Sequence, residues 1–154
     1  MSSRATNGMR GVYLVASELA RLGLITSPTS RSARGADILA TTSDCSHAFS
    51  VEVKTTTNQQ FWMLAEHAKS IRSKSHVFVF VHITQRKNGE EISYYPVVSR
   101  FVDDNARLPN PERSASKQYR KGYSIDLGVI KGFKGNWSIF QPKPSAAMPT
   151  PPQT

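Results

Sequence analysis

An acid and a base stand two residues apart in the segment FSVEVKTTT, residues 49–57. Apolar and polar residues alternate there, which predicts a strand whose side chains point in turn to two opposite faces. Val51 and Val53 would point into the core, while Glu52 and Lys54 would share the other face. A carboxylate beside an ammonium group is either an ordinary ion pair or a place where the two groups act together on a substrate.

A second acid is expected to approach this strand from its neighbour. The segment ADILATT, residues 36–42, also predicts a strand, and a turn over 42–47 would join it to a strand over 48–56 as a hairpin. Asp37 stands at the start of the first strand. Neighbouring strands of a hairpin bring opposed side chains within reach, so Asp37 can approach Glu52 and Lys54.

A third acid lies on a predicted helix. Apolar Val12, Val15 and Leu19 recur at helical spacing, which predicts a helix from Met9 to Leu22. Glu18 lies at the margin of this apolar stripe. A carboxylate in that position needs a partner or a metal ion, because its burial is costly otherwise.

Three carboxylates and one lysine form a plausible hydrolytic site. Carboxylate oxygens suit Mg²⁺ or Mn²⁺, and such ions polarise a phosphoryl group and lower the pKa of a bound water. We expect Glu18, Asp37 and Glu52 to hold the metal. Lys54 would orient the attacking water or neutralise charge on phosphorus.

Each of these residues also has a purely structural interpretation. The alternatives are a surface ion pair for Glu52 with Lys54, a turn cap for Asp37 after Gly35, and helix-surface pairing of Glu18 with Arg10 or Arg21. Other polar residues are assigned structural roles: Asp44 is expected to form the hairpin turn, and His47, His67, His76 and His82 show no zinc-ligand spacing.

The remaining segments predict an α/β domain with a mixed central sheet flanked by helices. The apolar run 76–83 is typical of a central strand covered on both faces, and Pro96 places the strand 92–99 nearer an edge. Helices are expected over 59–73 and 99–108, and a short strand over 125–130. We expect a flexible segment over 1–7, one domain over 8–140 and a disordered proline-rich tail over 141–154.

The motif and the element order resemble a known group of enzymes. The chain resembles the PD-(D/E)XK nuclease superfamily, with the restriction-endonuclease-like fold, through VASELARLG, RGADILA and VEVKTT. The resemblance covers roughly residues 8–83, and more loosely extends to residue 140. It departs from the family pattern at Ala36, where the proline of the motif would stand. The resemblance implies a metal-dependent endonuclease that hydrolyses DNA and leaves a 5′-phosphate, acting in restriction or repair or as a resolvase on branched DNA.

The charge balance fits an anionic partner. The 154 residues include 20 Lys and Arg against 11 Asp and Glu, a net charge of +9. Such an excess favours nucleic acid, whose phosphates would be neutralised in a salt-dependent way. The residues expected to contact DNA are Arg31, Arg34, Lys117, Arg120, Lys121, Lys131 and Lys134.

The cysteine content and the N-terminal residues indicate the expected cellular compartment. One cysteine, Cys45, excludes an internal disulfide, and the N-terminal residues contain no long apolar run, so we expect a cytoplasmic protein without a membrane span. A homodimer would place two sites on two DNA strands. The alternatives are a non-catalytic nucleic-acid-binding module on a nuclease-like fold and an α/β protein that binds an acidic protein.

Overall fold

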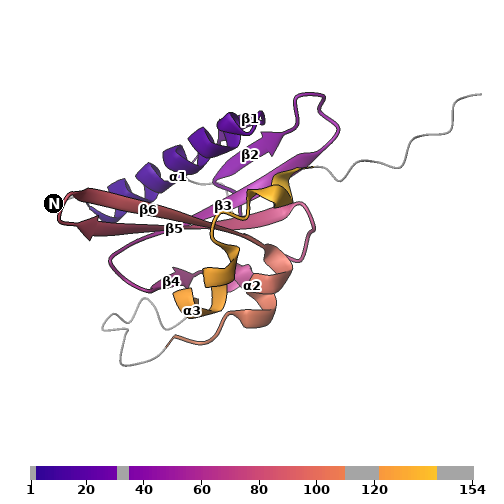
Figure 1. Cartoon of the computed structure of the whole chain (residues 1–154). Helices are drawn as coiled ribbons and strands as arrows, with labels where there is room; N and C mark the ends of the chain where they lie inside the picture. Colours follow the sequence, from indigo (N-terminus) through magenta and orange to yellow (C-terminus); the bar gives the residue numbers. More distant parts are fainter. Residues whose placement is uncertain (1–2, 31–34, 110–121, 142–154) are drawn as a thin grey trace, which may run out of the picture.

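A five-stranded mixed sheet forms the centre of the computed structural model, which describes residues 3–30, 35–109 and 122–141. The strand order is β1-β2-β3-β5-β6, with β3 and β5 parallel and the other neighbours antiparallel. Helix α1 covers one face, and β4, α2 and α3 lie on the other side (Figure 1). The expected α/β architecture is therefore confirmed.

The helices and strands have the following bounds, in chain order. They are α1 (Arg4–Arg21), β1 (Ile25–Pro28), β2 (Ile38–Thr41), β3 (Ala48–Thr57), β4 (Phe61–Leu64), η1 (Glu66–Lys69), β5 (His76–Arg86), β6 (Gly89–Val98), α2 (Ser99–Asn105), β7 (Tyr123–Asp126), α3 (Leu127–Ile130), η4 (Lys131–Phe133) and η5 (Trp137–Phe140).

Helix α1 begins earlier than its apolar periodicity indicated. Its first residue is Arg4, inside the segment expected to be flexible, because the side chain of Ser3 accepts a hydrogen bond from Thr6 N and caps the first turn. At the other end Gly23 adopts a φ of +86° and its N–H bonds to Ala20 O, which ends the helix. The earlier start brings the first turn of α1 close to the end of β3.

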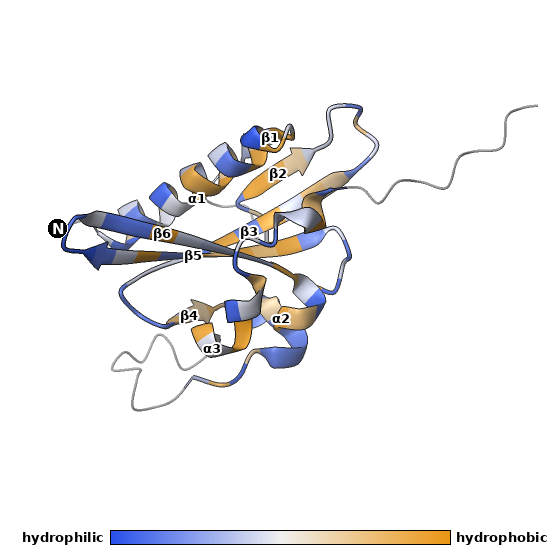
Figure 2. Cartoon of the chain, in the orientation of Figure 1, coloured by the Kyte–Doolittle hydropathy of each residue, from blue (hydrophilic) through white to orange (hydrophobic). Residues whose placement is uncertain are grey.

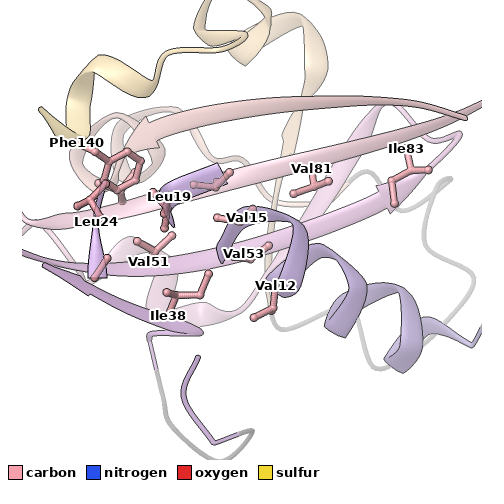
Figure 3. Packing of buried hydrophobic residues seen from close by; sticks show 13 residues of the cluster. Val12, Val15, Leu19, Leu24, Ile38, Val51, Val53, Val81, Ile83 and Phe140 are labelled. Carbon is pink, nitrogen blue, oxygen red and sulfur yellow. The ribbon is translucent and has the colours of Figure 1, made fainter. Parts of the chain in front are cut away.

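The odd-numbered residues of β3 face α1, as the alternation predicted. Val51 and Val53 are buried there against the helix residues Val12, Val15 and Leu19 (Figure 3). Burying an apolar stripe of a helix against an apolar sheet face is the main stabilisation available to such a pair of layers. The even-numbered side chains, including those of the candidate site, point to the opposite face.

The predicted helix over residues 59–73 is wrong. Residues Phe61–Leu64 form β4 instead, paired antiparallel with β7 as a separate two-stranded sheet. The side chains of Trp62 and Leu64 are buried in a second hydrophobic core, on the face of the sheet opposite α1, which also contains Phe78 and Phe80 of β5. Trp62 Nε1 donates a hydrogen bond to Val81 O at 3.1 Å. A strand partner some 60 residues away along the chain overrides the local helical preference, which leaves only the short η1.

The other strand predictions are largely confirmed. β5 has six consecutive buried residues from its start at His76, and β6, which contains Pro96, is an edge strand. The segment 125–130 is divided between the end of β7 and helix α3. Figure 2 shows hydrophilic residues gathered at the turn between β5 and β6. Among the described helices, none has the length and apolarity needed to cross a membrane.

Candidate active site

Asp37 lies against β3 between the acid and the base of the motif. It directly precedes β2, whose register pairs Ile38 with Val51. The backbone N–H of Asp37 donates to Val51 O at 2.8 Å, and its Oδ2 accepts from the N–H of Val53 at 2.7 Å. The carboxylate thus replaces the strand partner that β3 lacks beyond Ile38, the first residue of β2. The hairpin thus holds Asp37 against the backbone of Val53, the residue between Glu52 and Lys54.

Glu52 and Lys54 form a buried pair rather than a surface one. Lys54 Nζ lies 2.7 Å from Glu52 Oε1, and Glu52 is only 3% exposed. The Lys54 side chain is 25% exposed, so its ammonium end reaches toward solvent. A buried carboxylate is costly unless it is paired, and removal of its partner would leave the charge uncompensated. The interpretation as a solvated surface ion pair does not fit this burial.

Lys54 opens into a cleft of about 330 Å³ at the end of β3. One wall comes from the first turns of α1, and another from β4 and the turn before it. The half-buried Phe61 also lines this cleft. A molecule in the cleft would meet two cationic side chains and several hydroxyl and amide groups. The lining residues are Arg4, Asn7, Lys54, Thr55, Thr56, Thr57, Gln59, Phe61, Trp62 and Met63.

Glu18 lies apart from these residues. It forms an ion pair with Arg21, whose Nε donates to Glu18 Oε2 at 2.9 Å. Burial raises the pKa of Tyr94 on β6, and the negative charge of Glu18 raises it further, which places Glu18 toward that strand. Because α1 packs on the face opposite Glu52, the helix cannot deliver Glu18 to the motif. The structure therefore shows the alternative, helix-surface pairing.

The carboxylates present still fit a hard divalent cation. Within residues 3–30, 35–109 and 122–141, no three His, Cys, Asp or Glu side chains are grouped to hold a metal ion, so the expected three-carboxylate cluster is not formed there. However, Mg²⁺ commonly takes one or two carboxylates and completes its shell with water and substrate phosphates. Asp37 and Glu52 supply that number of oxygen-bearing groups.

Two histidines that the sequence suggested to be structural lie beside Glu52. His67 Nε2 is 3.3 Å from Glu52 Oε2, and His76 Nε2 is 3.9 Å from the same oxygen. His67 comes from η1, and His76 from the first position of β5, next to β3. The positions of these two histidines in the sequence do not indicate that they lie beside Glu52, because only the parallel crossover from β3 to β5 brings them to the motif.

Five of the seven residues expected to contact DNA lie outside the described residues: Arg31, Arg34, Lys117, Arg120 and Lys121. Lys131 is exposed in η4, and Lys134 Nζ is 3.7 Å from Glu91 Oε1 on β6. Neither of these two lines the cleft beside Lys54.

Comparison with known proteins gives a likeness in structure and none in sequence. No protein-family description matches the chain, and no curated protein matches it. The structure is similar to that of Hjc, a Holliday junction resolvase from the archaeal hyperthermophile Archaeoglobus fulgidus, with a TM-score of 0.48 and 14% sequence identity. The match covers 77% of this chain and 90% of that chain. A likeness at this level leaves the roles of individual residues to the geometry described above.

Proposed function

We propose that the protein is a divalent-metal-dependent endonuclease that hydrolyses phosphodiester bonds in DNA. The main support for the proposal is one hydrogen bond: the Asp37 carboxylate accepts from the N–H of Val53, the residue between Glu52 and Lys54. Glu52 and Lys54 on β3 therefore lie next to Asp37, which directly precedes β2, and Lys54 also lines the cleft.

Each residue has a distinct role in this proposal. Asp37 and Glu52 would hold Mg²⁺ or Mn²⁺, which when bound polarises the phosphoryl group and acidifies a water molecule. Lys54, already charge-paired with Glu52, orients the attacking water or neutralises charge on the phosphate oxygens. Glu18 has no part in it, because it is paired with Arg21.

The polynucleotide is recognised first through its charge. The net charge of +9 gives long-range attraction for a polyanion, and Arg4 and Lys54 place two cations within the cleft itself. Discrimination between targets would come from loops, from a homodimer or from the shape of branched DNA.

The experiment is a cleavage assay on supercoiled plasmid and on a synthetic four-way junction, with Mg²⁺, Mn²⁺ or EDTA. Wild type is compared with Lys54→Met and with Lys87→Met, a matched change at an exposed lysine in the β5–β6 turn. We expect cleavage only with metal, lost by at least about 100-fold in Lys54→Met and retained in Lys87→Met. A similar loss of cleavage in both lysine variants would show that cleavage depends on the net positive charge of the protein and not on the position of Lys54.

The competing function is a DNA-binding module without catalysis. It is favoured by the absence of a three-residue metal-binding group from the part of the chain that the structure describes. Salt-sensitive DNA binding that divalent metal does not change, together with intact plasmid and junction under every condition, would establish it in place of the nuclease.

A further inference from the structure

The cleft beside Lys54 follows an edge of β3 that no described strand covers. β2 pairs only with the first four residues of β3, and β5 lies along the other edge. On the open edge the N–H of Val53 donates to the carboxylate of Asp37. Backbone groups of alternate residues point to the same edge of a strand, so the N–H groups of Thr55 and Thr57 point to this edge as well. Both threonines line the cleft.

The charge of the cleft has one sign. Among the described residues that line it, Arg4 and Lys54 carry charge, and both are cations. Asp126, which pairs with Phe61 across β4 and β7, is outside the lining. A bound anion would be attracted by both cations and would meet N–H and hydroxyl donors, the groups that hold phosphate oxygens in complexes with nucleic acids.

The wall formed by β4 adds an apolar surface to these polar groups. Trp62 and Leu64 are buried in the second core, whereas Phe61 and Met63 alternate with them, are half-buried and line the cleft. Positions that point away from a core are ordinarily polar in antiparallel strands. An aromatic ring beside cations matches a nucleotide, whose base stacks on such rings and whose phosphate is anionic.

The turn between β3 and β4 fixes this wall. Asn58 adopts a φ of +58°, and its N–H donates to Ile83 O at 2.9 Å. Its side-chain oxygen accepts from the N–H of Gln85 at 2.9 Å. Both partners belong to β5, so the turn is tied to the central sheet. The position of β4 beside β3 is therefore set before a ligand binds, which lowers the entropic cost of binding.

The volume of the cleft distinguishes one nucleotide from a duplex. Pockets for small ligands begin at about 300 Å³, and this cleft measures about 330 Å³. The major groove of a DNA duplex is by itself about 12 Å wide and about 8.5 Å deep. Paired DNA must therefore remain outside, and a base that reaches Phe61 must be unpaired.

We propose that the cleft holds one unpaired nucleotide next to the scissile phosphate, with phosphate oxygens at Lys54 and Arg4 and the base against Phe61 and Met63. The inference deepens the proposed nuclease function and rests on it. It names the substrate class as DNA in which the strand to be cut is single-stranded beside the reacting bond, as at a tail, a gap or a branch, in preference to continuous duplex.

The test measures DNA binding in EDTA, so that no strand is cut. The probes are a blunt duplex, the same duplex with a short single-stranded tail, and the tailed duplex with 2-aminopurine in its tail. Fluorescence anisotropy gives the dissociation constants. The fluorescence of 2-aminopurine reports stacking of the unpaired base.

Two variants alter the cleft and two are matched controls. Phe61→Leu removes the aromatic ring but remains apolar, and Arg4→Met removes the charge. Tyr13→Leu and Arg100→Met make the same kinds of change at exposed residues outside the cleft. Circular dichroism confirms that each variant is folded.

We expect wild type to bind the tailed duplex at least about fivefold more tightly than the blunt duplex. Phe61→Leu and Arg4→Met should lose most of that preference, whereas Tyr13→Leu and Arg100→Met should keep it. Wild type should quench the 2-aminopurine fluorescence, and Phe61→Leu should not.

Equal affinity of wild type for the two duplexes, or an unchanged preference in folded Phe61→Leu and Arg4→Met, would overturn the inference and leave the proposed nuclease intact. A preference that depends on Phe61, in a protein that cuts no DNA with Mg²⁺ or Mn²⁺, would support the nucleotide cleft and reject the nuclease. Absence of binding to any of the probes would overturn both.

Discussion

The carboxylate of Asp37 accepts a hydrogen bond from the backbone N–H of Val53 at 2.7 Å, so one side chain both completes the edge of β3 and stands beside the motif. Its two possible roles, structural and chemical, can be separated. An asparagine keeps an oxygen acceptor for this N–H but loses the charge, whereas an alanine loses both.

Asp37→Asn is therefore expected to fold with nearly wild-type stability and to lose metal-dependent cleavage. Asp37→Ala should lose cleavage and also about 1–3 kcal/mol of stability, because the Val53 N–H is left without its acceptor. Urea unfolding and the plasmid assay together measure the two effects. Full cleavage by a folded Asp37→Asn variant would remove this residue from the catalytic site.

Glu18→Gln tests whether Glu18 is a helix-surface residue and not the metal ligand that the sequence predicted. Because Glu18 is paired with Arg21 on the helix surface, the change should cost about 0–1 kcal/mol and leave cleavage near wild type. Glu52→Gln provides the contrast, since it should abolish cleavage. If Glu18→Gln were as inactive as Glu52→Gln while remaining folded, the helix would have to contribute to the site after all.

Two glycines of α1 form a matched pair for stability. A Cβ at Gly11 would lie 1.8 Å from Thr55 Oγ1, whereas a Cβ at Gly8 would meet nothing within 4 Å. Gly11→Ala should destabilise by about 1–3 kcal/mol through overpacking, and Gly8→Ala should be neutral or stabilising by up to about 1 kcal/mol.

Urea unfolding midpoints measure the glycine variants, and Gly11→Ala combined with Thr55→Ala should recover part of the loss, because Oγ1 is removed. Equal midpoints for the two single variants would show that α1 does not pack so closely on β3.

Stability should fall on mild acidification because of His82. Burial lowers the pKa of this imidazole from its ordinary value of 6.5, with smaller opposing effects from the charge of Glu91 and a hydrogen bond to the Gln59 backbone. Between the lowered folded-state pKa and 6.5 the unfolded chain binds a proton that the folded chain does not. Unfolding is therefore favoured as the pH drops through that window.

We expect the urea midpoint to decrease between pH about 7.5 and about 5.5, and to decrease less in His82→Gln. His47→Gln, at an exposed histidine, should keep the wild-type pH dependence. An identical decrease in wild type and His82→Gln would assign the effect to other groups.

The sequence by itself determined the parts that depend on local pattern. Alternation in residues 49–57 placed Val51 and Val53 in the core and Glu52 with Lys54 on the other face. The hairpin that brings Asp37 to them also follows from local strand and turn signals, and Asp44 closes its turn by accepting hydrogen bonds from Ser46 and Thr42. These features depend on two strands that follow one another along the chain and on the turn between them.

Only the tertiary structure decided what depends on contacts distant along the chain. The pairing of β4 with β7 replaced the helix expected over 59–73, because a distant strand partner and a second core outweigh local propensity. The same second layer buries Glu52 and brings His67 to it, although no spacing in the sequence relates the two. Glu18 could be placed on its helix from the sequence, but the face on which that helix packs is a property of the whole sheet, and it separates Glu18 from the motif.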